Sequence, residues 1–155
     1  MMRACCDVLT ALRKKGMTLA TAESLTGGGI GAALTAVPGA SDVFKGGIIS
    51  YMNEIKRDML GVSQEILDRC GAVSAPTADA MAAGVRKLLK ADVAVSVTGL
   101  AGPGGDEFGH EVGTVYIGLA CPSLSTVVEC HFNGNREEIR EQTARAALTL
   151  VLENL

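Results

Sequence analysis

A serine, a carboxylate and three glycines stand together in the stretch Thr21-Ala-Glu-Ser-Leu-Thr-Gly-Gly-Gly29. Ser24 offers a hydroxyl, Glu23 a carboxylate, and the glycines a row of bare main-chain N–H groups that a ligand can approach closely. An apolar, β-branched run leads into the stretch and a small-residue helical run leaves it, which predicts a strand, a sharp turn and a helix. The positive end of a helix dipole suits a phosphate or a developing oxyanion. The structural alternative is a tight turn with Ser24 or Thr26 as N-cap.

A serine hydroxyl is a weak nucleophile unless a base accepts its proton. The two histidines, His110 and His131, form no Ser-His-Asp pattern, and no G-x-S-x-G motif is present. A neutral lysine can replace histidine, and Lys56 is the candidate. With Asn53 as N-cap, Lys56 would stand at N3 of a short helix, where the dipole and partial burial both lower the pKa of an amine. The alternative is a solvated helix lysine.

Three other features could complete a pocket. Tyr51, at the end of the preceding strand, could relay a proton or hold the serine and lysine in register. The glycine-rich loop Thr98–Gly105 offers N–H groups for an oxyanion or a phosphate, unless it is only a surface turn. Arg136 could clamp a phosphate or a carboxylate, or lie in solvent. The acidic and histidine side chains at 106–111 fit no common metal-site spacing, so we expect no metal.

The elements that must position these groups are predicted from apolar periodicity and turn residues. Helices are expected at 4–14, 26–37, 54–60, from 63, at 75–90 and from 136, and strands at 18–21, 43–51, 92–97, 112–120 and 125–132. Ser63 is expected to cap its helix, and Ser74 to open the helix at 75–90, whose core face is Met81, Val85, Leu88 and Leu89. The last two strands are expected to form an antiparallel hairpin. This order predicts an α/β fold: a three-layer α/β/α sandwich with a mixed, mostly parallel sheet, in one domain spanning residues 1–155. Ligands bind outside the carboxyl ends of parallel strands, so the polar clusters are expected to converge there.

Composition excludes several classes of protein. A content of 48% hydrophobic and 20% charged residues is that of a globular chain. A net charge of −3, without a basic stripe or an aromatic stacking set, argues against nucleic acid as a partner. No apolar run approaches the length of a membrane span, so no membrane role is expected. The five cysteines form no CxxC pair, which indicates reduced thiols in a cytoplasmic protein.

The glycine-rich stretch that follows Ser24 is related to two known nucleotide-binding motifs only weakly or not at all. Gly27-x-Gly29-x-x-Ala32 matches the loosened dinucleotide fingerprint, but glycine-rich turns satisfy this pattern often. The phosphate loop G-x-x-x-x-G-K-[ST] is absent. Neither motif therefore assigns a nucleotide site by itself.

Taken in order, several motifs form a specific series. The chain closely resembles the CinA carboxy-terminal domain family, the nicotinamide-nucleotide amidases, from about residue 4 to 152. The motifs are Thr21-Ala-Glu-Ser-Leu-Thr-Gly-Gly-Gly29, Gly47-Ile-Ile-Ser-Tyr-Met-Asn-Glu-Ile-Lys56, Leu60-Gly-Val62, Gly71-Ala-Val-Ser74, Val97-Thr-Gly-Leu-Ala-Gly-Pro-Gly-Gly105 and Val112-Gly-Thr-Val115.

The resemblance implies hydrolysis of nicotinamide mononucleotide to nicotinate mononucleotide and ammonia, which recycles pyridine nucleotide. It implies Ser24 as the nucleophile, Lys56 as the general base and Tyr51 as an assisting group. It implies no cofactor and no metal, a small-molecule nucleotide as the partner, and a homodimer or higher homo-oligomer. The implied substrate-binding residues are Thr26, Gly27, Gly28, Asn53, Thr98, Gly99, Gly102, Gly104, Gly105 and Arg136.

Two alternatives remain open from the sequence. The first is a non-catalytic module that binds a pyridine or adenine nucleotide, or a partner, in the same pocket. The second is an amidase for a different amide-bearing nucleotide. The second rests on a departure from the family pattern, because His110-Glu111 replaces the Lys-Pro often seen before Val112.

Overall fold

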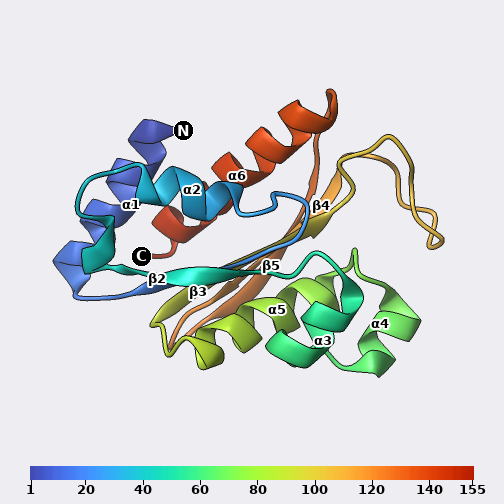
Figure 1. Cartoon of the computed structure of the whole chain (residues 1–155), viewed down its shortest axis with the longest axis horizontal. Coiled ribbons are helices and arrows are strands. Elements are labelled where there is room, and N and C mark those ends of the chain that lie inside the picture. Colours follow the sequence, from blue (N-terminus) through green and yellow to red (C-terminus); the bar gives the residue numbers. More distant parts are fainter.

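The computed structural model describes all residues from 1 to 155 and contains one five-stranded sheet in the order β2-β1-β3-β4-β5 (Figure 1). β1 pairs in parallel with β2 and β3, whereas β4 pairs antiparallel with β3 and β5. Only β4 opposes the common strand direction, which confirms the predicted mixed, mostly parallel sheet. The strands are β1 (Leu19–Glu23), β2 (Phe44–Ile49), β3 (Val93–Gly99), β4 (Thr114–Ala120) and β5 (Ser125–His131).

Helices cover both faces of the sheet and complete the predicted three-layer sandwich (Figure 1). One layer packs on β1, β2, β3 and β4, and its helices also contact one another; it consists of α1 (Met2–Lys15), α2 (Gly29–Thr35) and α6 (Arg136–Glu153). The other layer is centred on a helix that contacts β1, β3, β4 and β5; it consists of α3 (Asn53–Leu60), α4 (Gln64–Cys70) and α5 (Ala75–Leu88). A short 3₁₀ turn, η1 (Ala40–Asp42), precedes β2.

The core is aliphatic and divided by the sheet into two clusters. The larger cluster has 22 buried residues, drawn mainly from α1, α2, α6 and the strands, and the smaller has nine, centred on α5. Met81 and Val85 of α5 are buried as the periodicity predicted. Leu88 was expected to face the core, but it is 44% exposed, because the buried stripe of α5 continues from Val85 to Leu89, which packs against the smaller cluster.

Several helix starts follow from side-chain caps, and others do not. Ser63 and Ser74 accept the N–H groups of Ile66 and Thr77, as their positions predicted. The prediction that Asn53 caps α3 is wrong, because Met52 is the N-cap and Lys56 is therefore one residue further into the helix than expected.

The strand ends bring distant segments of the chain together. Glu23 at the end of β1 lies opposite Ile49 of β2 and Val97 of β3, so the segments that follow these strands emerge at one edge of the sheet. The predicted antiparallel hairpin of β4 and β5 is confirmed, and β5 forms the far edge of the sheet. No helix is both long and apolar enough to cross a membrane.

Candidate active site

A polar cavity of about 250 Å³ lies at the carboxyl ends of the parallel strands. It is bounded by the turn after β1, the start of α3, the segment before α5, the loop after β3 and the start of α6. The lining residues that the sequence singled out are Ser24, Tyr51, Asn53, Lys56, Thr98, Gly99, Gly102, Gly104 and Arg136, and the others are Leu25, Ala72, Val73, Leu100 and Ala101.

The centre of the cavity is a serine–lysine pair. Lys56 Nζ lies 3.1 Å from Ser24 Oγ, 2.7 Å from the Ser50 carbonyl oxygen and 3.2 Å from the Tyr51 carbonyl oxygen. A neutral amine has two N–H bonds for the two carbonyl groups, and its lone pair is then free to accept the serine proton. The predicted proximity of Ser24 and Lys56 is therefore confirmed.

Burial prepares Lys56 to be neutral. Its side chain is only 1% exposed, and no carboxylate forms an ion pair with it. Desolvation disfavours the charged ammonium and lowers the pKa of Lys56 from 10.5 to about 8. About a tenth of this side chain is thus the free base at pH 7, and the neutral fraction reaches about half near pH 8.

Main-chain bonds tie the two halves of the pair together. Ser50, directly after β2, donates its N–H to the Glu23 carbonyl oxygen at 2.8 Å, and its own carbonyl accepts from Lys56. Ser24 donates its N–H to Val97 of β3 at 3.0 Å. The nucleophile and the base are consequently fixed to adjacent strand ends rather than to mobile surface segments.

Tyr51 takes a different place from the one predicted for a proton relay. Its side chain is 57% exposed, and its hydroxyl accepts a hydrogen bond of 3.1 Å from Arg136 Nη2. Arg136 Nη1 also donates to the Gly102 carbonyl oxygen. The tyrosine hydroxyl therefore lies with Arg136 at the rim of the cavity, and only the Tyr51 carbonyl contacts the lysine amine.

The N–H groups of the first glycine-rich turn are bound by a carboxylate of the protein itself. Oε2 of Glu23 accepts the Thr26 hydroxyl at 2.7 Å and the N–H groups of Gly28 and Ile30 at 3.1 and 3.0 Å, and Oε1 accepts the Gly31 N–H at 2.8 Å. The expectation of a row of bare N–H groups is wrong for Gly28, Ile30 and Gly31, because the buried carboxylate already occupies the start of α2. The alternative of Ser24 or Thr26 as N-cap is also wrong, since Gly28 is the N-cap.

The predicted site residues thus divide into two groups. Nine of them line one cavity, whereas Thr26, Gly27, Gly28 and Gly105 do not. Sequence reasoning named Glu23 only as a group that the turn presents. The sequence did contain a signal for this role: a carboxylate ends an apolar strand just before a glycine-rich helix start. Such a carboxylate can accept the free N–H groups at the start of the helix.

Arg140 is a neighbour of this turn that sequence reasoning missed. It lies on α6, and its guanidinium donates to the Leu25 and Thr26 carbonyl oxygens at 2.9 and 3.0 Å. More than a hundred residues separate the arginine from the turn, and no local pattern signals such a contact. His110, the site of the departure from the family pattern, pairs with Asp106 at 2.7 Å and does not line the cavity.

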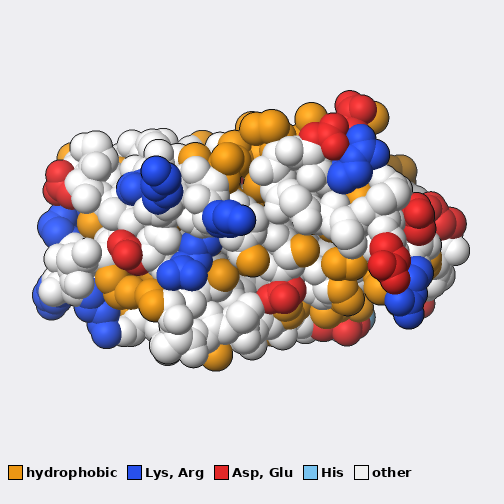
Figure 2. Space-filling view, turned by 90° about the horizontal axis from the view of Figure 1, so that it is seen from below, with side chains coloured by type: hydrophobic (Ala, Val, Ile, Leu, Met, Phe, Trp, Pro, Cys, Tyr) orange, Lys and Arg blue, Asp and Glu red, His pale blue; other side chains and the backbone are white.

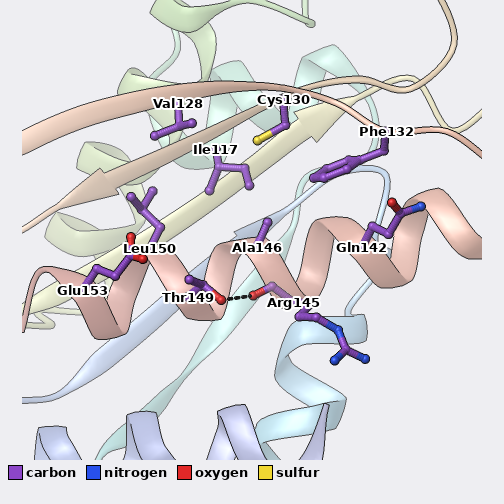
Figure 3. Close-up of a pocket in the computed structure, with 10 residues that line it drawn as sticks. All are labelled: Ile117, Val128, Cys130, Phe132, Gln142, Arg145, Ala146, Thr149, Leu150 and Glu153. Atoms are coloured by element: carbon purple, nitrogen blue, oxygen red, sulfur yellow. Dashed lines mark hydrogen bonds between the residues drawn. The ribbon is translucent and has the colours of Figure 1, made fainter.

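A second hollow, of about 410 Å³, lies between α6 and strands β4 and β5 (Figure 3). Ile117, Val128, Cys130 and Phe132 form its sheet side, and Ala146 and Leu150 of α6 face them. Burial raises the pKa of the Cys130 thiol, which disfavours the nucleophilic thiolate. This groove therefore offers no activated thiol nucleophile.

The face formed by the α3–α5 layer carries charges of both signs. Figure 2, which views the molecule from that side, shows lysine and arginine side chains separated by neutral atoms and by acidic side chains. No three histidine, cysteine, aspartate or glutamate side chains are placed together so that they could hold a metal ion.

Comparison with known proteins gives a consistent result. The family model described as the CinA C-terminal domain matches residues 4–155. A CinA-like protein of Synechocystis is 55% identical over 111 residues, which cover 72% of this chain and 27% of the relative. A CinA-like protein of Synechococcus is 48% identical over 146 residues, which cover 93% of this chain and 35% of the relative. The chain thus spans about a third of the length of the curated relatives it matches.

Solved structures agree along almost the whole chain. The competence damage-inducible protein A of Klebsiella pneumoniae superposes with a TM-score of 0.96 at 34% identity, covering 98% of this chain and 94% of that one. The competence/damage inducible protein of Agrobacterium tumefaciens gives a TM-score of 0.94 at 39% identity, covering 98% and 93%.

Proposed function

This chain belongs to the CinA C-terminal domain family, and we propose that it is an amidase that hydrolyses the carboxamide of nicotinamide mononucleotide. The products are nicotinate mononucleotide and ammonia. The observation that carries the proposal is the buried Lys56 amine, 3.1 Å from the Ser24 hydroxyl and held by two carbonyl groups. Such a pair suits acyl transfer, because it supplies a nucleophile and its base without a histidine.

The first half of the reaction forms an acyl-enzyme. Ser24 Oγ attacks the carboxamide carbon while its proton passes to Lys56 Nζ, and the carbonyl oxygen becomes an oxyanion. As the intermediate collapses, the C–N bond breaks and Lys56 returns the proton to the departing nitrogen, which leaves as ammonia.

The second half repeats these roles with water. Lys56 accepts a proton from a water molecule whose oxygen attacks the acyl carbon, and the ester bond to Ser24 then breaks. The proton on Lys56 returns to Ser24 Oγ, and the acid product is released. The sum of the two halves is one amide and one water consumed, and one carboxylic acid and one ammonia formed.

The rim of the cavity supplies groups for the nucleotide. Arg136 has no acidic partner and faces the cavity, so it is suited to the phosphate. Asn53 and Thr98 add polar side chains, and the N–H groups of Gly102 and Gly104 donate to no group within the chain. Free main-chain donors of this kind suit an anionic or carbonyl oxygen.

Ammonia release from nicotinamide mononucleotide tests the proposal. We expect turnover by the wild-type protein and a loss of about 10⁴-fold or more in kcat for Ser24→Ala and for Lys56→Met. Circular dichroism and Tm serve as controls for folding, and Lys45→Met, which removes an exposed lysine at the other end of β2, is the matched control that keeps full activity.

Other outcomes would contradict the proposal in distinct ways. Turnover that survives both substitutions refutes the serine–lysine mechanism. Tight nucleotide binding without wild-type turnover favours the binding module, and faster release of ammonia from another amide-bearing nucleotide favours the alternative substrate.

A further inference from the structure

The turn that carries the nucleophile is held from two sides by charged side chains. The Glu23 carboxylate accepts the Thr26 hydroxyl and the N–H groups at the start of α2. The Arg140 guanidinium, on the side of α6, donates to the carbonyl oxygens of Leu25 and Thr26. The five residues 24–28 therefore lie between an anion and a cation, both of which bind their main chain.

Arg140 has no other partner that would explain its position. It forms no ion pair with any carboxylate, although charged side chains are rarely buried without one. It is half-buried, and it does not line the cavity, in contrast to Arg136, which lies one turn earlier on the same helix and does. Both of its hydrogen bonds go to the turn after the nucleophile.

The consequence for the turn follows from the planarity of the peptide bond. In a trans peptide the C=O and the next N–H point in opposite directions. Arg140 draws the Leu25 carbonyl toward α6, so the Thr26 N–H points away from α6. The Ser24 carbonyl accepts the Gly27 N–H at 3.0 Å, which turns the Leu25 N–H outward from the turn. Neither the Leu25 nor the Thr26 N–H donates to any group in the chain.

We propose that Arg140 is a positioning residue for acyl transfer, which fixes the Ser24 turn so that Ser24 Oγ stays beside Lys56 and the Leu25 N–H stays free for the oxyanion. The inference rests on the proposed function for its reaction. Leu25 lines the cavity with Ser24, and the N–H directly after a serine nucleophile is a common oxyanion donor. Arg140 acts on the reaction only through this turn and does not touch the substrate.

A matched pair of arginine variants tests this role. Arg140→Met is expected to lower kcat for ammonia release by roughly 10- to 100-fold with little change in KM, because a displaced nucleophile slows the chemical step. Arg136→Met is expected to raise KM, because it removes a group at the cavity rim. A merely structural role for Arg140 would lower Tm without this separation of kcat from KM.

A second readout does not depend on the nucleotide. Phenylmethylsulfonyl fluoride labels activated serines, and intact-mass measurement gives its rate of reaction with Ser24. We expect the labelling rate to fall in parallel with kcat in Arg140→Met and to stay at the wild-type value in Arg145→Met, which removes an exposed arginine of the same helix outside the cavity. If Arg140→Met does not fold, Arg140→Lys replaces it as the test variant. One ammonium group cannot reproduce the contact that the guanidinium makes with two nitrogens, so the kcat and the labelling rate of Arg140→Lys are expected to fall as well.

The results separate the inference from the function on which it rests. A wild-type protein that labels at Ser24 but releases no ammonia refutes the proposed substrate, and the labelling rates still decide the role of Arg140. A folded Arg140→Met or Arg140→Lys variant with wild-type kcat and labelling rate overturns the inference. If the wild-type protein neither reacts with phenylmethylsulfonyl fluoride nor releases ammonia, Ser24 is not an activated nucleophile, and the inference about Arg140 is refuted with it.

Discussion

Two glycine-rich turns follow parallel strands of this sheet, and their N–H groups have different partners. The turn after β1 directs its N–H groups at Gly28, Ile30 and Gly31 to the Glu23 carboxylate. The loop after β3 leaves the N–H groups of Gly102 and Gly104 without a partner in the chain, and both residues line the cavity.

The difference teaches that glycine content does not identify an anion site. Glu23, a buried acid directly before Ser24, accepts the N–H groups of the first turn and makes them part of the scaffold. The N–H groups of Gly102 and Gly104 in the second loop remain open to a ligand. The glycines of the first turn let the backbone around the nucleophile adopt its shape, and those of the second loop let the substrate approach the main chain. The predictions below test this division, from the largest expected effect to the smallest.

Glu23→Gln should produce the largest loss of stability. The carboxylate only accepts hydrogen bonds, whereas an amide would turn two N–H donors toward the donors of the turn. We expect a loss of about 2–4 kcal/mol in the free energy of unfolding, which corresponds to a decrease of roughly 5–15 °C in Tm. Thermal unfolding measures it, and an unchanged Tm would show that the carboxylate does not hold the turn.

Replacing one glycine of each turn by alanine should cost less stability than Glu23→Gln, and the two turns should differ in that cost. Gly28 has a φ of +96°, and an added Cβ would lie 3.1 Å from the Ile49 side chain, so Gly28→Ala should cost about 1–2 kcal/mol. Gly104 has open space around its Cα, so Gly104→Ala should change stability by less than about 0.5 kcal/mol. We expect Gly104→Ala instead to raise KM by a few-fold, because the added methyl group narrows the approach to the loop. Equal losses of stability at both positions would contradict the division.

Much of the fold was predictable because it depends on local patterns. Alternating apolar strands and helices, together with the short connection between β4 and β5, predicted the layers and the mixed sheet. Ser63 was correctly identified as a helix cap and Ser74 as the start of α5, because a cap acts within three residues of itself. The convergence of Ser24 and Lys56 followed from the rule that parallel strands present their carboxyl ends together.

The remaining features depend on contacts that no local pattern contains. The acceptor role of Glu23 depends on how α2 leaves the turn, and the contact of Arg140 joins residues at opposite ends of the chain. Arg136 was predicted as an anion clamp, but its bonds to Tyr51 and Gly102 are set by how α6 meets the sheet. Tertiary packing, rather than propensity, decides each of these.

The pH dependence of kcat/KM for ammonia release from nicotinamide mononucleotide tests the central claim most directly. Burial lowers the pKa of Lys56 to about 8, and only the neutral amine can accept the Ser24 proton. We therefore predict that kcat/KM rises with pH and reaches half of its maximum near pH 8. A rate that stays constant from pH 6 to pH 10, or that falls as Lys56 loses its proton, would contradict a lysine base in this site.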